Sequence, residues 1–352
     1  MKRIATVLAA IALLAAPAMA AAQTIDPQAD LAPQAQTLVE AENAEHLKGL
    51  KRVFIPSFQV HFVTESKASA QINGIQVITG APSNVTIKLT GVEDARMQAL
   101  ADGLYARTVQ QLTDAGIEVV PLEQLKAHPA FAELAASGQP APKEEDASAG
   151  KGKFFSTQGL PLHYLDEVGF IQKIVLFGKK PEDAFLPLGS KMGAAFSAGG
   201  VQMQEERLAK DLQAAALKVR ITVLGGQLHV SNDFWTGKNI SAVAAASFPP
   251  LVNRMAFVLP DGRKARLSLK EGVHSGQLGE LVNVTSTASQ AGDVARNVLS
   301  VALMLGGQRG IGYGRSQDFE WRADAPDFES VIASFQPGIT RMFTLRLQEL
   351  VK

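Results

Sequence analysis

The chain has 352 residues, with 34 basic side chains, 34 acidic side chains and no cysteine. Without cysteine it can form no disulfide, thiolate nucleophile or Cys-ligated metal centre, and it lacks the acylated Cys of a bacterial lipoprotein. The charges balance and no dense Lys/Arg cluster is present, which argues against a nucleic-acid-binding protein.

The first 22 residues have the three parts of a secretory signal peptide. Lys2 and Arg3 give a basic start, an apolar run covers 4–16, and Ala18-Met19-Ala20 supplies the small-x-small cleavage pattern. The apolar run is shorter than the roughly 20 residues that cross a bilayer. We therefore expect cleavage after Ala20 or Ala22, export to a bacterial periplasm and no transmembrane segment.

The next segments change from helical to strand-like patterns. Leucines among Ala, Gln and Glu predict a helix over 29–50, and the aromatic and β-branched run over 51–63 predicts a strand bent at Pro56. The runs 71–79 and 84–90 flank a Gly-Ala-Pro-Ser turn, so we expect a hairpin there.

The clearest helix is predicted over 94–115. Its apolar residues recur at three- and four-residue steps, and Gly116 stands where a C-terminal cap is expected. A short strand over 117–121 and a second helix over 122–134, stopping around His128, follow. The order after the bent strand is thus helix, strand, helix.

Four groups of residues in this region carry a resemblance. They are Arg52-Val53-Phe54-Ile55-Pro56-Ser57-Phe58, the helical Leu100, Leu104, Val109 and Leu112, the strand Gly116-Ile117-Glu118-Val119-Val120, and Leu122-Glu123-Gln124-Leu125. Together they resemble the small α/β domain of the CsgG family of curli secretion and the TolB N-terminal domain. The resemblance implies an envelope protein that binds other periplasmic or outer-membrane components. The Cys that lipidates the pore-forming members is missing, which argues against an outer-membrane secretion pore.

Residues 136–153 are predicted to be a linker or mobile loop, because Ser, Gly, Pro and mixed charges dominate and no large apolar residue anchors a core. A partner-docking strip is the alternative. The remaining part, 154–352, is predicted to form a mixed α/β domain. Its expected elements are a strand over 171–177, a helix over 205–217, a strand over 218–224, a hairpin of 255–259 and 264–270 around Pro-Asp-Gly-Arg, a strand over 280–287, a helix capped by Asp324, a Pro337-Gly338 break and a helix over 339–351.

The histidines show no metal-ligand spacing, and neither His-Glu-x-x-His nor Gly-x-Ser-x-Gly occurs. An enzyme would need a site assembled from scattered groups such as His163, Asp166 and Asp233, for which the sequence offers no positive sign. We assign no catalytic, cofactor-binding or metal-ligating residue. The six histidines are His46, His61, His128, His163, His229 and His274.

The glycine-rich stretch 306–314 follows a helical pattern over 294–305 instead of a strand. A dinucleotide site requires a strand before the glycines and a helix after them, so we expect a helix stop and a flexible turn. The small-residue stretches 194–200 and 240–248 suit close packing or an apolar cleft.

These observations predict a mixed α/β protein with a signal peptide (1–22), an N-terminal helical segment (23–50), a CsgG/TolB-like α/β domain (51–135), a linker (136–153) and a mixed sheet domain with C-terminal helices (154–352). The expected function is that of a non-enzymatic periplasmic envelope protein, without a cofactor, acting as a protein-interaction or assembly module. The alternative is a periplasmic carrier that holds a small or lipidic, hydrophobic ligand between two domains.

Overall fold

The fold is given by a computed structural model that describes residues 23–25, 30–69, 82–147, 150–157, 159–163, 188–233, 237–250, 252–275, 281–287, 315–322 and 325–352. The strands are β1 Gln23–Thr24, β2 Val39–Glu42, β3 Arg52–Ser69, β4 Pro82–Thr90, β5 Glu118–Val119, β6 Lys143–Ala147, β7 Gly150–Ser156, β8 Ala215–Asp233, β9 Gly237–Phe248, β10 Arg254–Val258, β11 Lys264–Leu269, β12 Val273–His274, β13 Val282–Asn283 and β14 Arg315–Arg322. The helices are α1 Ala32–Leu38, the 3-10 helix η1 Ala44–Leu47, α3 Asp94–Asp114, α4 Leu122–Lys126, α5 Pro129–Ala136, α7 Leu188–Leu212 and α9 Ala325–Leu350.

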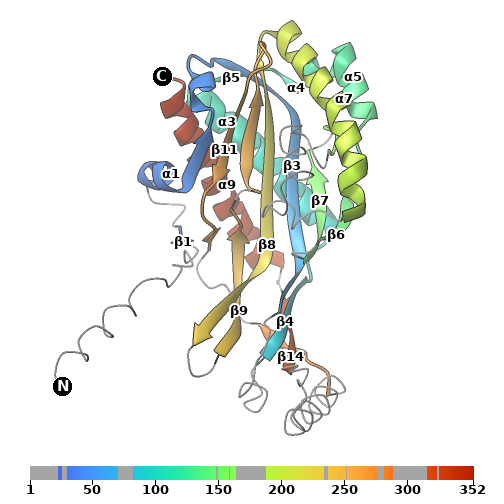
Figure 1. The fold of residues 1–352 in the computed structure, drawn as a ribbon, viewed down its shortest axis with the longest axis vertical. Coiled ribbons are helices and arrows are strands. Elements are labelled where there is room, and N and C mark those ends of the chain that lie inside the picture. Colours follow the sequence, from blue (N-terminus) through green and yellow to red (C-terminus); the bar gives the residue numbers. More distant parts are fainter. Residues whose placement is uncertain are drawn as a thin grey trace, which may run out of the picture.

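One mixed sheet organises the molecule, which confirms the expected α/β class (Figure 1). Its strand order is β1-β12-β9-β8-β3-β4-β14-β13, with β10, β11 and β2 branching from β8 and with β7 and β6 branching from β3. The two longest strands, β3 and β8, run parallel to each other. They lie far apart in the sequence, so their pairing joins the first half of the chain to the second.

The bend in β3 is where the sequence predicts it. The register between β3 and β8 shifts between Phe54 and Ser57, on either side of Pro56. Proline has no N–H to donate to a ladder, and an interior strand tolerates it only where the pairing is interrupted.

Beyond the bend, the two faces of β3 differ in polarity because successive side chains alternate. Phe58 lies edge-on to Tyr105 of α3, with ring centroids 5.4 Å apart, so this apolar face packs beneath α3. Gln59 and His61 belong to the opposite face. Lys218 of β8 is on that face too, and there it reaches Glu205 of α7. Helix α3 also packs on α9, and α7 packs on α5 (Figure 1).

The expected parts 51–135 and 154–352 share one sheet and one hydrophobic core, a question that the sequence leaves open. The core cluster runs from Ile25 to Leu347 and includes residues of both parts, such as Phe58 and Val219. A domain boundary between separate cores is therefore not present in the described residues.

The linker predicted over 136–153 is wrong. Strands β6 and β7 form an antiparallel hairpin here, paired from Lys143 with Phe154 to Ala147 with Gly150, and β7 continues the sheet along β3. The composition suggested a linker because β6 is an edge strand made mostly of charged residues. One of them, Glu144, forms an ion pair with Lys151 of β7. The residues that anchor the hairpin, Phe154 and Phe155, follow the stretch in question.

The helix predicted over 29–50 is too long. Helix α1 ends at Leu38, and β2 then pairs with β11, with Val39 opposite Leu269 and Glu42 opposite Arg266. The β-branched Val39 fits a strand, and pairing with a distant partner overrides the local helical spacing.

The break predicted at Pro337-Gly338 is also wrong, because α9 continues through it. Pro337 cannot donate to the carbonyl of Ala333, which would leave that oxygen without its helical partner. Arg107 of α3 donates to the Ala333 carbonyl from 3.5 Å, and Gln111 donates to the Pro337 carbonyl from 3.0 Å. The packing of α3 on α9 thus replaces the missing bond.

Several other predictions are confirmed. Helix α3 ends next to Gly116, which has φ +82°, and α4 and α5 divide at His128. Strands β10 and β11 form the expected hairpin, with Gly262 at φ +80°. The helix predicted over 205–217 has different bounds: α7 begins at Leu188 and ends at Leu212, because β8 begins at Ala215. The strand at 171–177, the first hairpin strand at 71–79 and the Asp324 cap lie outside the described residues.

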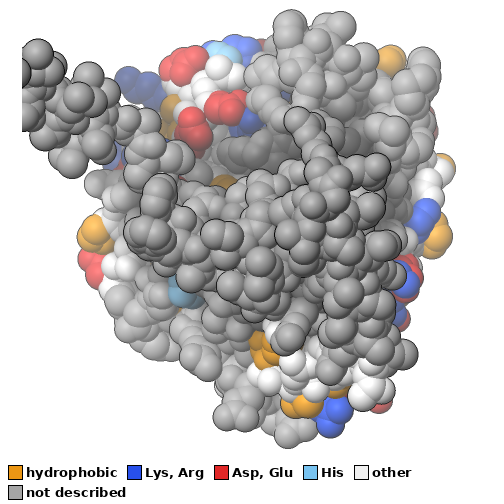
Figure 2. Space-filling view, turned by 60° about the horizontal axis from the view of Figure 1, so that its bottom comes forward, with side chains coloured by type: hydrophobic (Ala, Val, Ile, Leu, Met, Phe, Trp, Pro, Cys, Tyr) orange, Lys and Arg blue, Asp and Glu red, His pale blue; other side chains and the backbone are white. Residues whose placement is uncertain are grey.

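On the face shown in Figure 2, basic and acidic side chains of the described residues are interspersed, and no extended basic patch forms among them. None of the helices in the described part of the chain is both long and apolar enough to cross a bilayer.

Candidate functional site

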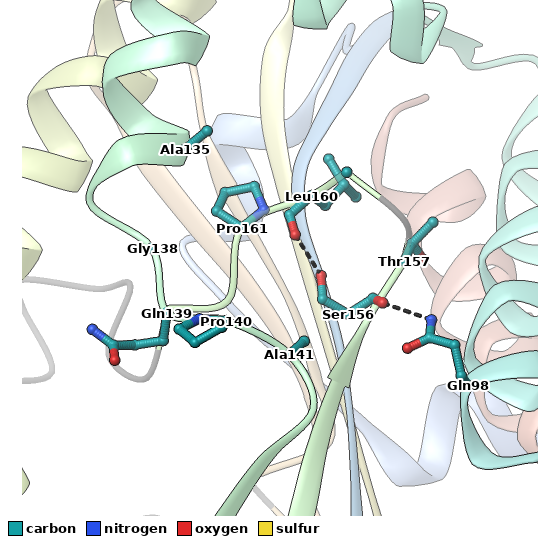
Figure 3. A pocket seen from close by; sticks show the side chains of 11 residues that line it. Gln98, Ala135, Gly138, Gln139, Pro140, Ala141, Ser156, Thr157, Leu160 and Pro161 are labelled. Atoms are coloured by element: carbon teal, nitrogen blue, oxygen red, sulfur yellow. Dashed lines mark hydrogen bonds between the residues drawn. The ribbon is translucent and has the colours of Figure 1, made fainter. Parts of the chain in front are cut away.

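A cavity of about 460 Å³ lies where β7 ends (Figure 3). Its walls come from the N-terminal part of α3, the loop after α5 and the turn after β7. Ala135, Gln139 and Pro140 are exposed, so the cavity opens to solvent. The residues that line it are Gln98, Ala135, Gly138, Gln139, Pro140, Ala141, Ser156, Thr157, Gly159, Leu160 and Pro161.

Hydrogen bonds fix two polar side chains of this wall. Gln98 reaches from α3 and donates through Nε2 to the Ser156 carbonyl at 2.8 Å and to Asp102 Oδ1 at 3.1 Å. The Ser156 hydroxyl lies 3.1 Å from the Leu160 carbonyl and 3.2 Å from the Phe58 carbonyl (Figure 3). These contacts tie α3, β7 and β3 together and give the cavity a preformed shape.

Two glycines allow the close approaches that shape the wall. A Cβ on Gly138 would lie 2.6 Å from the Pro161 Cβ, and a Cβ on Gly159 would lie 2.6 Å from Lys126 Nζ. Gly159 also has φ +80°, a conformation that other residues rarely adopt. The ammonium group of Lys126 therefore packs against Gly159 at the wall of the cavity. The Glu123 carboxylate lies 3.7 Å from Lys126 Nζ.

A second feature is a buried polar layer on the α7 side of the sheet. Arg220 of β8 donates to Gln59 Oε1 at 2.8 Å and to the His163 carbonyl at 3.2 Å. His61 stacks on Phe154 with ring centroids 3.9 Å apart. Burial, together with the positive charge of Arg220, lowers the pKa of His61 to about 3, so its imidazole is neutral at physiological pH.

Gly152 permits this stacking, and its replacement gives a first prediction. A Cβ there would lie 2.5 Å from the Phe62 carbonyl oxygen and 2.7 Å from His61 Nε2. We expect Gly152→Ala to lower the free energy of unfolding by about 1–3 kcal/mol, since both neighbours are buried. Gly103→Ala is the matched control, because its Cβ would meet nothing within 4 Å on helix α3. Urea unfolding should show the control slightly stabilised, and equal stability of Gly152→Ala and wild type would contradict the prediction.

The scattered groups His163, Asp166 and Asp233 do not form a site in the described residues. His163 lies beside Arg220, whereas Asp233 ends β8 thirteen residues further along, roughly 40 Å away in an extended strand. Asp166 lies outside the described residues, as do the glycine-rich stretch 306–314 and the helical pattern before it. Among the described side chains, no group of three or more His, Asp or Glu is arranged to hold a metal ion.

The sequence did not single out any residue of the cavity. Its loop 138–141 belongs to the segment predicted to be a linker, and Thr157 follows a strand that was not predicted. The polar layer can be recognised in the sequence. Ser57, Gln59 and His61 alternate with Phe58, Val60 and Phe62, which is the pattern of a strand with a polar face and an apolar face.

A third feature is the open edge of β9. Strand β8 pairs with β9 along its length, from Ser247 to Gly237, but on the other edge β12 pairs only with Ser247 and Phe248. No other strand of the described residues covers positions 237–245 on that edge. This segment contains one charged residue, Lys238, and no proline.

Comparison with known proteins gives no relative: no protein-family model, no curated protein and no solved structure matches the chain. The resemblance of residues 51–134 to the CsgG family and the TolB N-terminal domain therefore stays a prediction.

Proposed function

We propose that this chain is a non-enzymatic protein of the bacterial envelope that acts as a protein-interaction or assembly module, and that a strand of a partner chain pairs with the open edge of β9. The observation that carries the proposal is the row of backbone groups over positions 237–245, with which no strand of the described residues other than β8 pairs. Such an edge presents N–H donors and C=O acceptors at the spacing that another strand requires.

The other edges of the sheet support this choice by contrast. Strand β6 has four charged residues among its five, and β13 is only two residues long. Charge and shortness are the devices that keep sheet edges from pairing with other chains. Positions 239–245 have neither charge nor proline, so of these three described edges β9 has the least protection against strand addition. In Figure 1 the β8–β9 pair extends away from α5 and α7.

The envelope location rests on the signal-peptide pattern and on the resemblance described above, both of which are sequence predictions. The proposal is tested on the mature full-length chain, tagged and expressed with its own leader. Sedimentation velocity measures self-association, and a mild-detergent pull-down from envelope extracts measures capture of other envelope proteins.

Val243→Lys is expected to weaken the association at least about tenfold, because a lysine on an edge must be desolvated when a second strand pairs with it. Ala136→Lys, at the exposed end of α5, is the matched control and should associate as the wild type does. A wild type that stays monomeric and captures no defined envelope protein would overturn the proposal, as would association that Val243→Lys leaves unchanged.

A further inference from the structure

We infer that the partner at the open edge of β9 is a second copy of this chain, with the two β9 strands running antiparallel about a twofold axis at Ile240. This inference rests on the proposed function and names the partner chain. It concerns residues 237–243, the part of the edge in which β9 pairs with β8 without a shift in register.

Two features limit the pairing segment at its far end. The Ser275 amide donates to the Ala246 carbonyl and the Ser275 hydroxyl accepts from the Ala246 amide, both at 2.9 Å, so the backbone of Ala246 is already paired. Next to it, β9 advances three residues, from Ala246 to Val243, while β8 advances two. Such a bulge bends a strand and interrupts regular pairing. The regular segment therefore runs from Gly237, where β9 begins, to Val243.

A second copy is the partner that satisfies two open edges at once. A strand that pairs with an open edge needs an unpaired edge of its own, of matching length, and β9 of another copy has one. Each β9 already has β8 on its other side, so twofold pairing occupies the open side of both strands. A partner that supplied a single free strand would instead present a new edge to further chains.

The one charge in the segment favours this register. Lys238 is the only charged residue among 237–243. An axis at Ile240 pairs every position from 237 to 243 and places Lys238 opposite Ala242 of the second copy. The two Lys238 positions then lie roughly 13 Å apart along the strands, beyond the screening distance of about 8 Å at physiological ionic strength. An axis at Lys238 would set the two lysines directly opposite each other, which is destabilising.

The dimer should be weak, because the paired segment is short. A pair of such strands buries less than the roughly 1,600 Å² of a standard interface, and small interfaces are transient. We expect a dissociation constant of about 1–100 μM by sedimentation velocity. Val243 pairs with Gly237 of the second copy, so a lysine at position 243 would lie next to Lys238 of that copy. Repulsion between the two charges then adds to the effect of Val243→Lys.

The absence of cysteine from the chain allows single-cysteine variants to report the pairing. Residues opposite each other in antiparallel strands have Cα atoms about 4.5–5.5 Å apart, which is within the range of a disulfide. Mature full-length Ile240→Cys should therefore form a disulfide-linked dimer on mild oxidation. Ala136→Cys, at the exposed end of α5, is the matched control and should crosslink at least about tenfold less.

A mixture of two variants tests the register. Lys238→Cys and Ala242→Cys, one of them carrying a tag that changes its mass, should form a mixed dimer, because these positions face each other across the axis. Each variant alone should crosslink with itself far less, since its two cysteines would lie roughly 13 Å apart along the strands.

The outcomes separate this inference from the proposed function. A chain that sediments as a monomer, but captures a defined envelope protein in a manner that Val243→Lys abolishes, would overturn the inference and leave the proposed function standing. A chain that neither associates nor captures a partner would overturn both. The inference also fails if Ile240→Cys crosslinks no better than Ala136→Cys, or if Lys238→Cys crosslinks with itself as readily as with Ala242→Cys.

Discussion

Replacing Glu205 by Leu is expected to lower the free energy of unfolding by about 3–5 kcal/mol. Glu205 of α7 lies 3.0 Å from Lys218 Nζ, and the side chains of both residues are almost completely buried, at 1% and 2% exposure. The substitution leaves the ammonium of Lys218 in the interior without this carboxylate. Arg220 and Arg254 lie on the same face of the sheet, so the substitution removes a carboxylate from a face that carries three buried cations.

Urea unfolding followed by circular dichroism measures this effect, with Glu206→Leu as the control. Glu206 is the next residue on α7 and is partly exposed, so its substitution should change stability by about 0.5 kcal/mol or less. The double variant Glu205→Leu with Lys218→Met should recover most of the loss, because an apolar pair replaces the ion pair without leaving a buried charge. A loss of under about 1 kcal/mol for Glu205→Leu would show that the pair does not hold α7 on the sheet.

Elements defined by local pattern were predictable from the sequence. Helix α3 follows from its apolar spacing and Gly116, the β10–β11 hairpin from Asp-Gly between alternating runs, and the bend in β3 from Pro56. In each case the residues that determine the element lie within it or directly next to it, so no distant contact is needed to recognise it.

Elements defined by distant partners were not predictable. Strand β2 exists because β11 pairs with it, and α9 continues past Pro337 because α3 supplies donors to two of its carbonyls. The parallel pairing of β3 with β8 joins residues more than 150 positions apart, and nothing in either strand specifies the other. For the same reason the sequence could not decide whether the two halves share a core.

The candidate sites show the same limit. Nothing in the sequence links Ser156 to Gln98 until α3 brings the two together, and in the described residues β12 pairs with β9 only at Ser247 and Phe248. The polar layer is the exception, since the alternation of Ser57, Gln59 and His61 with aromatic and aliphatic residues was visible in the sequence.

Lowering the pH is expected to destabilise the fold through His61. In the unfolded chain this imidazole has its ordinary pKa of 6.5, whereas burial and the nearby Arg220 lower its pKa in the folded chain to about 3. Between these two values the unfolded chain binds more protons than the folded chain, so the stabilisation is complete above pH 6.5 and is lost as the pH falls towards 3. The free energy of unfolding should therefore decrease by up to about 1.4 kcal/mol per pH unit across this window.

The variant His61→Gln isolates this contribution, because the carboxylates that also titrate at low pH are the same in both proteins. Urea unfolding of wild type and variant at several pH values between 4 and 7 gives two curves. Since a neutral glutamine has no proton to gain, the wild type should lose stability more steeply than the variant below about pH 6.5. Parallel curves would show that His61 is not responsible for the acid sensitivity, and that the stack with Phe154 tolerates a protonated imidazole.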